Sequence, residues 1–156
     1  MARRDHYHEP NAPKPNSLRV AVSAFVLDDA GRRLMIRRTD NDRYAIPGGG
    51  QEFVESVAQA VVREVEEETG LTVEVTGLIG IFSDPGYVIE YDDGEVRQEF
   101  SLCFHARPVA GELRTSDESK EVLWVAPAEL DNLNVHPAIR LRIARGFERG
   151  DQPYYT

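Results

Sequence analysis

Apolar residues recur along this chain with two spacings, and each spacing predicts a different kind of element. The segment from Ser56 to Thr69 contains no Gly or Pro, and its valines repeat at every fourth position. This spacing predicts an amphipathic helix, which Gly70 is well suited to end. A second helix is predicted from Pro137 to Phe147, because proline suits the first position of a helix.

Short runs that are continuously apolar, or that alternate between apolar and polar residues, predict strands. The sequence Asp92-Asp93-Gly94 predicts a tight hairpin turn between two of them, and Asp84-Pro85-Gly86 should interrupt the chain just before. Residues 108–120 are expected to form a polar loop, and Pro127 to Leu130 a helical turn. The predicted strands are Arg19 to Leu27, Arg33 to Arg38, Thr72 to Phe82, Tyr87 to Tyr91, Glu95 to Arg107 and Val122 to Val125.

The order of these elements predicts an α/β (α+β) fold, with a mixed β-sheet in an α/β/α sandwich. A chain of 156 residues is long enough for one domain with a single core. We expect that domain to span residues 18–150. Residues 1–17, rich in Pro, Asn, His and charge, are expected to be a flexible N-terminal tail, and residues 151–156 a C-terminal tail.

The composition of the chain limits the kinds of ligand and the location that we expect. A formal net charge of −9 argues against a nucleic-acid polymer as the ligand, because such surfaces are basic. The single cysteine, Cys103, is expected to be buried in a strand, and it cannot form a disulfide within one chain. No apolar run is long enough for a membrane span, and the N-terminus lacks the apolar stretch of a secretory signal. We therefore expect a cytoplasmic protein.

An acidic cluster on the first predicted helix is the main candidate for chemistry. Helical spacing places Glu64, Glu67 and Glu68 on one face, where like charges destabilise a helix unless a cation binds them. Carboxylate oxygens are the ligands that Mg²⁺ prefers, and Mg²⁺ retains water or phosphate oxygens in its remaining positions. Three glycines, Gly48 to Gly50, precede the helix and allow the backbone to approach a ligand closely.

The same segment fits a fixed template. Gly49 is followed after five residues by Glu55, and after seven more by Arg63-Glu64-Val65-Glu66-Glu67-Glu68-Thr69-Gly70-Leu71. With ordinary residue frequencies, such a match arises by chance roughly once in 10⁸ starting points. The segment resembles the Nudix box, the metal-binding catalytic motif of Nudix hydrolases, and the predicted order of elements resembles the layout of that family.

The resemblance implies a Mg²⁺-dependent hydrolase, with Mn²⁺ as an alternative cation, that cleaves the diphosphate of a nucleoside diphosphate linked to another moiety. It implies that the carbonyl of Gly48 and the carboxylates of Glu64, Glu67 and Glu68 bind the metal. Either Glu67 or Glu64 would also act as the base. Arg63 would orient carboxylates, and Gly49, Glu55 and Gly70 would be structural. Further catalytic candidates are Glu118 and Glu121, and the arginines that could bind phosphate are Arg37, Arg38, Arg43 and Arg97.

The sequence contains two conflicting indications of the substrate. A residue some fifteen positions beyond the box distinguishes subgroups of the family, and here Pro85, typical of ADP-ribose enzymes, competes with Tyr87, typical of dinucleoside polyphosphate enzymes. We slightly favour ADP-ribose or another ADP-sugar, with a nucleoside triphosphate next.

Two other functions are compatible with this fold. One is a nucleotide- or ADP-ribose-sensing domain without turnover, and the other is a prenyl diphosphate isomerase. The intact box argues against both. A homodimer is also expected, with Tyr7 and Tyr154-Tyr155 as candidate interface residues.

Overall fold

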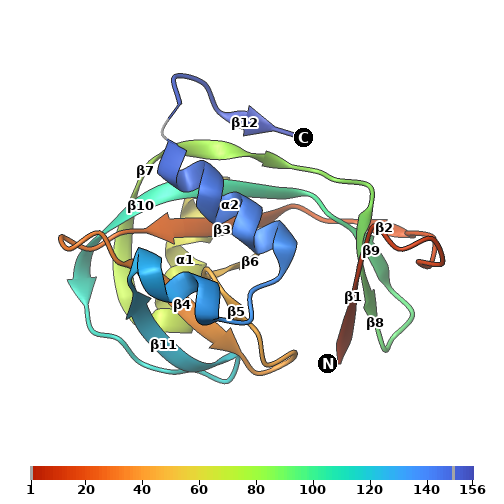
Figure 1. Ribbon diagram of the computed structural model, residues 1–156, viewed down its shortest axis with the longest axis horizontal. Helices are drawn as coiled ribbons and strands as arrows, with labels where there is room; N and C mark the ends of the chain where they lie inside the picture. The colour runs from red at the N-terminus through yellow and green to blue at the C-terminus, as the bar shows by residue number, and fades with distance from the viewer. Residues whose placement is uncertain (1, 149) are drawn as a thin grey trace.

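The computed structural model describes residues 2–148 and 150–156. Their strands form three sheets, and two α-helices pack on the central one (Figure 1). The central sheet is mixed and has the strand order β12-β7-β10-β3-β6. Its strands are β12 (Tyr154–Tyr155), β7 (Leu71–Phe82), β10 (Ser101–Gly111), β3 (Ala21–Val26) and β6 (Gly48–Gly50).

Two smaller sheets flank the central one. The first has the order β11-β4-β5, formed by Ser119–Val125, Arg33–Arg38 and Tyr44–Ala45. The second has the order β1-β8-β9-β2, formed by Arg3–Tyr7, Tyr87–Tyr91, Val96–Gln98 and Ser17–Leu18. A 3₁₀ helix, Pro127–Asn132, precedes the last helix.

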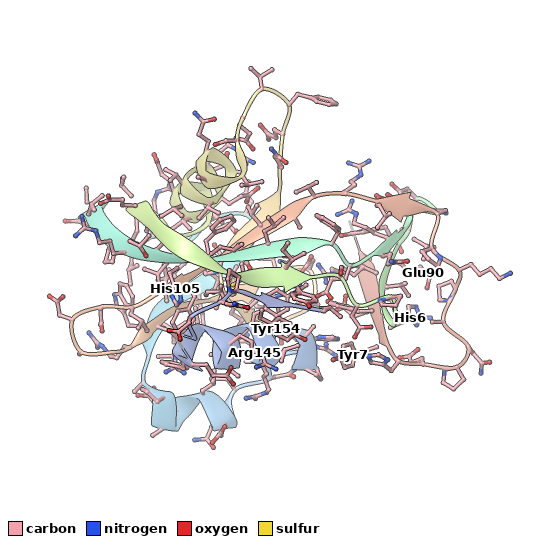
Figure 2. All side chains as sticks on the ribbon, turned by 90° about the horizontal axis from the view of Figure 1, so that it is seen from above. His6, Tyr7, Glu90, His105, Arg145 and Tyr154 are labelled. Atoms are coloured by element: carbon pink, nitrogen blue, oxygen red, sulfur yellow. The ribbon has the colours of Figure 1, made fainter. Side chains whose placement is uncertain are left out.

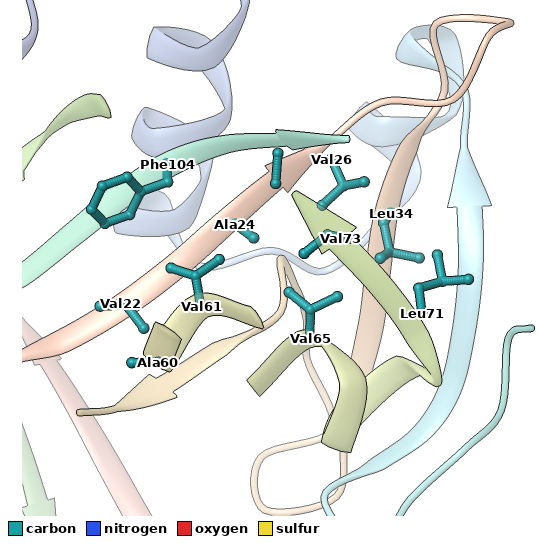
Figure 3. Packing of buried hydrophobic residues seen from close by; sticks show 11 residues of the cluster. Val22, Ala24, Val26, Leu34, Ala60, Val61, Val65, Leu71, Val73 and Phe104 are labelled. Atoms are coloured by element: carbon teal, nitrogen blue, oxygen red, sulfur yellow. The ribbon is translucent and has the colours of Figure 1, made fainter. Parts of the chain in front are cut away.

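The two α-helices cover opposite faces of the central sheet, which confirms the predicted sandwich. Figure 2, seen from above, shows α1 (Val57–Thr69) on one side of the sheet and α2 (Pro137–Glu148) on the other. Figure 3 shows the α1 side of the core, where Val61 and Val65 face Val22 and Val73 of the sheet. Burying such apolar surface is the main stabilising contribution to a fold of this size.

Local sequence sets both ends of α1, and its end at Gly70 is the predicted one. Ser56 caps the helix by accepting a hydrogen bond from the Gln59 amide, and the Gln59 side chain accepts one from the Ser56 amide in return. Gly70 ends it in the left-handed conformation, with φ of 84°, which a residue without a Cβ adopts freely. Cys103 is buried in β10, as predicted.

The structure corrects the expectation of a loose tail at the N-terminus. Residues Arg3–Tyr7 form β1, which pairs antiparallel with β8. Besides its backbone pairing and the packing of Tyr7, polar contacts hold this strand, because His6 lies between Glu9 and Glu90 at 2.7 and 3.0 Å. Figure 2 shows His6 and Glu90 side by side at this end of the molecule. A strand held by polar contacts carries no hydrophobic period, and hydropathy therefore does not reveal it.

The C-terminal residues are likewise paired rather than loose. Tyr154 and Tyr155 align with Gly80 and Ile81 of β7. A Cβ at Gly80 would lie 2.5 Å from the Tyr154 carbonyl oxygen, and the close approach of β12 therefore requires glycine there. Tyr7 and Tyr154 both pack within their own chain, on Tyr87 and on Phe82. These two side chains therefore make their ring contacts within one subunit.

The predicted strand from Glu95 to Arg107 is wrong as a single element. Only Val96–Gln98 pairs with β8, and after Glu99 and Phe100 the chain enters the central sheet as β10. Glu99 turns its carboxylate inward to Arg142 of α2, which interrupts the alternation at this point. The predicted loop at 108–120 is also shorter, because β10 continues to Gly111 and β11 begins at Ser119. Within the described residues, no helix is long and apolar enough to span a bilayer.

Candidate active site

The glycine turn and the acidic face of α1 are in direct contact. The amide of Gly48 donates a hydrogen bond to Oε1 of Glu68 at 2.8 Å. A Cβ at position 49 would lie 2.5 Å from the Glu64 carboxylate, and only glycine therefore allows this packing. The turn is also fixed from behind, because Gly48 and Gly49 pair with Ser23 and Val22 of β3.

The three glutamates of the cluster differ in their surroundings. Glu68 and Glu64 are buried, whereas the side chain of Glu67 is 59% exposed. Burial raises the pKa of Glu68 to about 8, because a charged carboxylate loses hydration there. Burial also raises the pKa of Glu64, although hydrogen bonding from Arg63 opposes the shift. Two buried carboxylates on one helix turn are an unfavourable arrangement that a cation would relieve.

Arg63 donates hydrogen bonds to several groups on and beside the acidic face of α1. Its guanidinium binds both oxygens of Glu55, at 3.0 and 2.7 Å, and holds the pKa of that carboxyl down at about 2. It also donates to Oε1 of Glu64 at 2.9 Å, to Oε2 of Glu67 at 3.3 Å and to the carbonyl of Gly50 at 2.9 Å. One side chain therefore joins the glycine turn, the loop before α1 and two of the three glutamates.

Of the two acidic candidates beyond the helix, the structure brings one near the cluster. The charge of Glu118 contributes to raising the pKa values of both Glu64 and Glu68. Its loop is tied to the helix, since the Ser119 hydroxyl donates to the Glu68 carbonyl at 2.5 Å. Glu121 instead accepts a hydrogen bond from the hydroxyl of Tyr44.

A cavity adjoins the glycine turn on the side away from α1, and its lining is basic. Six arginines and two carboxylates line it, in a chain whose formal net charge is −9. Gly48 and Gly49 belong to its wall and thus connect it to the acidic helix face. A basic cavity in an acidic protein favours an anionic ligand. The charged lining residues are Arg3, Asp5, Arg19, Arg38, Arg43, Arg97, Glu99 and Arg142.

Three of the four arginines predicted to bind phosphate, Arg38, Arg43 and Arg97, line this cavity, whereas Arg37 does not line it and pairs with Asp42 at 2.9 Å. The three that line it differ in their hydrogen-bond partners. Arg38 is held by both oxygens of Asp40, and Arg97 by both oxygens of Glu95. In the described part of the chain, the Arg43 guanidinium has only Asp5 nearby, at 3.8 Å, which is too long for a hydrogen bond. Arg43 is therefore the arginine of the three whose donors remain available to a ligand.

Sequence reasoning missed two residues of the cavity wall, Asp5 and His136. Asp5 of β1 and His136 before α2 line the cavity together with Tyr87 of β8, which the sequence indicated only as a sign of substrate class. His136 stacks on Tyr87 with ring centroids 4.6 Å apart and an angle of 16° between the planes. The one local signal was the position of His136 directly before Pro137, where a helix cap is expected.

Comparison with known proteins agrees with this fold. The NUDIX domain model matches residues 17–145. A MutT-like protein of Streptomyces ambofaciens is 38% identical over 119 residues, covering 76% of this chain and 71% of that protein. An ADP-ribose pyrophosphatase of Methanocaldococcus jannaschii is 36% identical over 128 residues, covering 77% of this chain and 65% of that protein.

A solved structure agrees as well. The crystal structure of a MutT NUDIX hydrolase from Burkholderia pseudomallei has a TM-score of 0.66 and 28% identity, covering 83% of this chain and 98% of that one. Fold and site together thus define a hydrolase of phosphate-containing small molecules. The chain belongs to the Nudix family, whose members generally use divalent metal cations and act on small nucleotide substrates.

Proposed function

We propose that this chain is a Mg²⁺-dependent pyrophosphohydrolase that cleaves the diphosphate of a nucleoside diphosphate linked to another moiety. The observation that carries the proposal is the junction at Gly48 and Gly49 between an acidic helix face and an arginine-lined cavity. The acidic face suits a divalent cation, and the basic cavity suits the anionic substrate that such a cation contacts.

The side chains fit a hard divalent cation. In this proposal Glu64, Glu67 and Glu68 bind it together with the carbonyl of Gly48, and Mg²⁺ is the favoured ion, with Mn²⁺ able to replace it. Among the residues that the structure describes, no three His, Cys, Asp or Glu side chains are arranged to hold a metal ion, and Glu64 and Glu67 are hydrogen-bonded to Arg63. In this proposal these two carboxylates turn from Arg63 toward the cation, whose remaining positions are filled by water or phosphate oxygens. When bound, the cation would neutralise the diphosphate and polarise the phosphorus under attack.

The remaining catalytic and binding roles belong to side chains of the protein. Glu67 or Glu64 acts as the base that takes a proton from the attacking water, and the exposure of Glu67 makes it reachable from solvent. Arg63 positions these carboxylates through the hydrogen bonds described above. We assign Glu118 as an additional carboxylate near the metal, and we leave Glu121 out of the site, because it accepts a hydrogen bond from Tyr44 and lies 3.9 Å from Arg37. Arg43 binds phosphate oxygens in the cavity.

ADP-ribose or another ADP-sugar is the favoured substrate. Pro85 supports this choice, and so does the similarity to a pyrophosphatase of ADP-ribose in Methanocaldococcus jannaschii. A nucleoside triphosphate is the second candidate. A cytoplasmic location and a homodimer complete the proposal. Because Tyr7 and Tyr154 pack within one chain, the dimer would bury other surfaces.

The test is a screen of nucleoside diphosphate derivatives and triphosphates with Mg²⁺ or Mn²⁺, in the presence and absence of EDTA. We expect cation-dependent hydrolysis that Glu67→Gln reduces by roughly 10²- to 10⁴-fold. The matched control is Glu66→Gln, because Glu66 is an exposed neighbour in the same helix that is not one of the proposed metal ligands. Hydrolysis that persists in EDTA, or equal loss in both variants, would contradict the proposal. Tight binding without turnover would instead favour a sensing domain.

A further inference from the structure

The strand at the N-terminus contributes a carboxylate to the cavity wall. Oδ1 of Asp5 accepts two hydrogen bonds from Arg3, at 3.0 and 2.7 Å. Oδ2 lies 3.8 Å from Arg43, and the whole side chain is 6% exposed. Arg3 also donates to the Tyr87 hydroxyl at 3.3 Å, which holds this group of residues together. Asp5 therefore has a fixed position and one oxygen whose hydrogen-bonding capacity is not used by Arg3.

His136, directly before α2, presents the complementary group. The amide of Ala138 can only donate, so Nδ1 of His136 must accept its hydrogen bond at 3.1 Å. Burial lowers the pKa of His136 to about 4, and the ring is therefore neutral at pH 7, with its proton on Nε2. Within residues 2–148 and 150–156, no hydrogen bond occupies that Nε2–H. The cavity wall thus offers an acceptor on Asp5 and a donor on His136.

We propose that Asp5 and His136 bind hydroxyl groups of the sugar that the diphosphate joins to the nucleoside. These contacts would select a sugar-linked diphosphate over a nucleoside triphosphate. A hydroxyl both donates and accepts, which matches a carboxylate oxygen beside an Nε2–H. A carboxylate that binds ribose hydroxyls is an established solution in other nucleotide-binding folds. An ionised phosphate has no proton to donate to Asp5 and adds a like charge beside it.

This inference rests on the proposed hydrolase activity and adds the class of group that the cavity recognises. It also gives β1 a role in the site, which a purely structural strand would lack. A purely structural Asp5 would serve only to hold Arg3, and its loss would then affect all substrates alike. The two roles therefore differ in the ratio of activities rather than in activity itself.

The experiment compares kcat/KM for ADP-ribose and for ATP, both with Mg²⁺. We expect the wild type to favour ADP-ribose, and Asp5→Asn to lower kcat/KM for ADP-ribose by about 10- to 200-fold, mostly through KM. Hydrolysis of ATP should change by less than about threefold, since ATP carries only the ribose of its adenosine and lacks the second sugar, joined through the diphosphate, that these residues bind. The matched control is Arg4→Ala, an exposed position on the same strand, which should leave both values unchanged.

A second variant tests the same inference if Asp5→Asn fails to fold. His136→Asn removes the Nε2–H but keeps a side-chain oxygen that can cap α2, and it should shift the ratio in the same direction as Asp5→Asn. A wild type that prefers ATP, or variants that lower both activities equally, would overturn this inference while leaving the hydrolase assignment intact. A wild type that cleaves neither substrate nor any other nucleotide diphosphate would overturn the proposed function, and this inference with it.

Discussion

The ion pair between Glu99 and Arg142 provides a quantitative test of the packing in the wall of the cavity. The two side chains are 6% and 10% exposed, and Nη2 of Arg142 lies 2.7 Å from Oε2 of Glu99. The other oxygen of Glu99 accepts a hydrogen bond from the Asp84 amide at 3.1 Å. This pair therefore connects α2 to the segment where the chain leaves β9 and enters the central sheet.

Removing one partner should be costly because the other charge remains buried. Breaking a buried pair in this way typically lowers the free energy of unfolding by about 3–5 kcal/mol, and Arg142→Met should fall in that range. For a chain of this length the melting temperature should drop by roughly 10 °C. The double variant Glu99→Gln/Arg142→Met should cost clearly less than the sum of its two single variants, because it leaves no charge without a partner.

Urea unfolding monitored by the fluorescence of Trp124 measures these values, since it is the single tryptophan and packs against the core. The control is Glu148→Gln, which removes an exposed pair with Arg145 of nearly the same length, 2.8 Å. That change should cost less than about 1 kcal/mol. Equal effects of Arg142→Met and Glu148→Gln would refute the reasoning that burial determines the cost.

Three further predictions concern the loop before α1, the arginine of the box and the N-terminal strand. Arg63→Lys and Glu55→Gln should each lower kcat by about 100-fold with little change in KM, because they misplace carboxylates without removing them; wild-type kcat in both variants would contradict this. Val54, a β-branched residue with φ of 64°, should be replaceable by Asn with a gain of about 1 kcal/mol in urea unfolding. Phe53→Asn, equally exposed but without positive φ, should bring no such gain. The hydrogen bond from His6 to the Glu9 carboxylate raises the pKa of His6 above 6.5, so the stability that His6 adds should be fully present below pH 6.5 and lost as pH rises through the folded-state pKa. The difference in unfolding free energy between the wild type and His6→Gln, measured from pH 5 to 9, should fall with pH, and a flat or rising difference would contradict it.

Local sequence was sufficient for the elements that carry the box. Helix α1 is predictable because its apolar period, its cap at Ser56 and its stop at Gly70 all lie within one segment. The glycine turn is predictable for the same reason, although only the structure shows that Gly49 is required by the Glu64 carboxylate. Where local preferences agree with the fold, sequence reasoning succeeds.

The part of the cavity wall around Asp5 and His136 depends instead on contacts between distant parts of the chain. His6 and Glu90 are 84 positions apart, and no period or motif in either segment indicates that they meet. The inward turn of Glu99 has the same origin, because its partner Arg142 lies 43 positions away. Among the arginines, sequence could not separate Arg43 from Arg38 and Arg97, since their availability depends on which acids lie beside them.

The central claim is that Glu64, Glu67 and Glu68 hold a divalent cation, and a titration with Mn²⁺ followed by electron paramagnetic resonance tests it most directly. Free Mn²⁺ gives a signal that protein binding diminishes, so the number of bound ions can be counted without turnover. We predict that the wild type and Glu66→Gln bind Mn²⁺ alike, while Glu68→Gln binds it at least about tenfold more weakly. Binding that is equal in all three proteins would contradict the account.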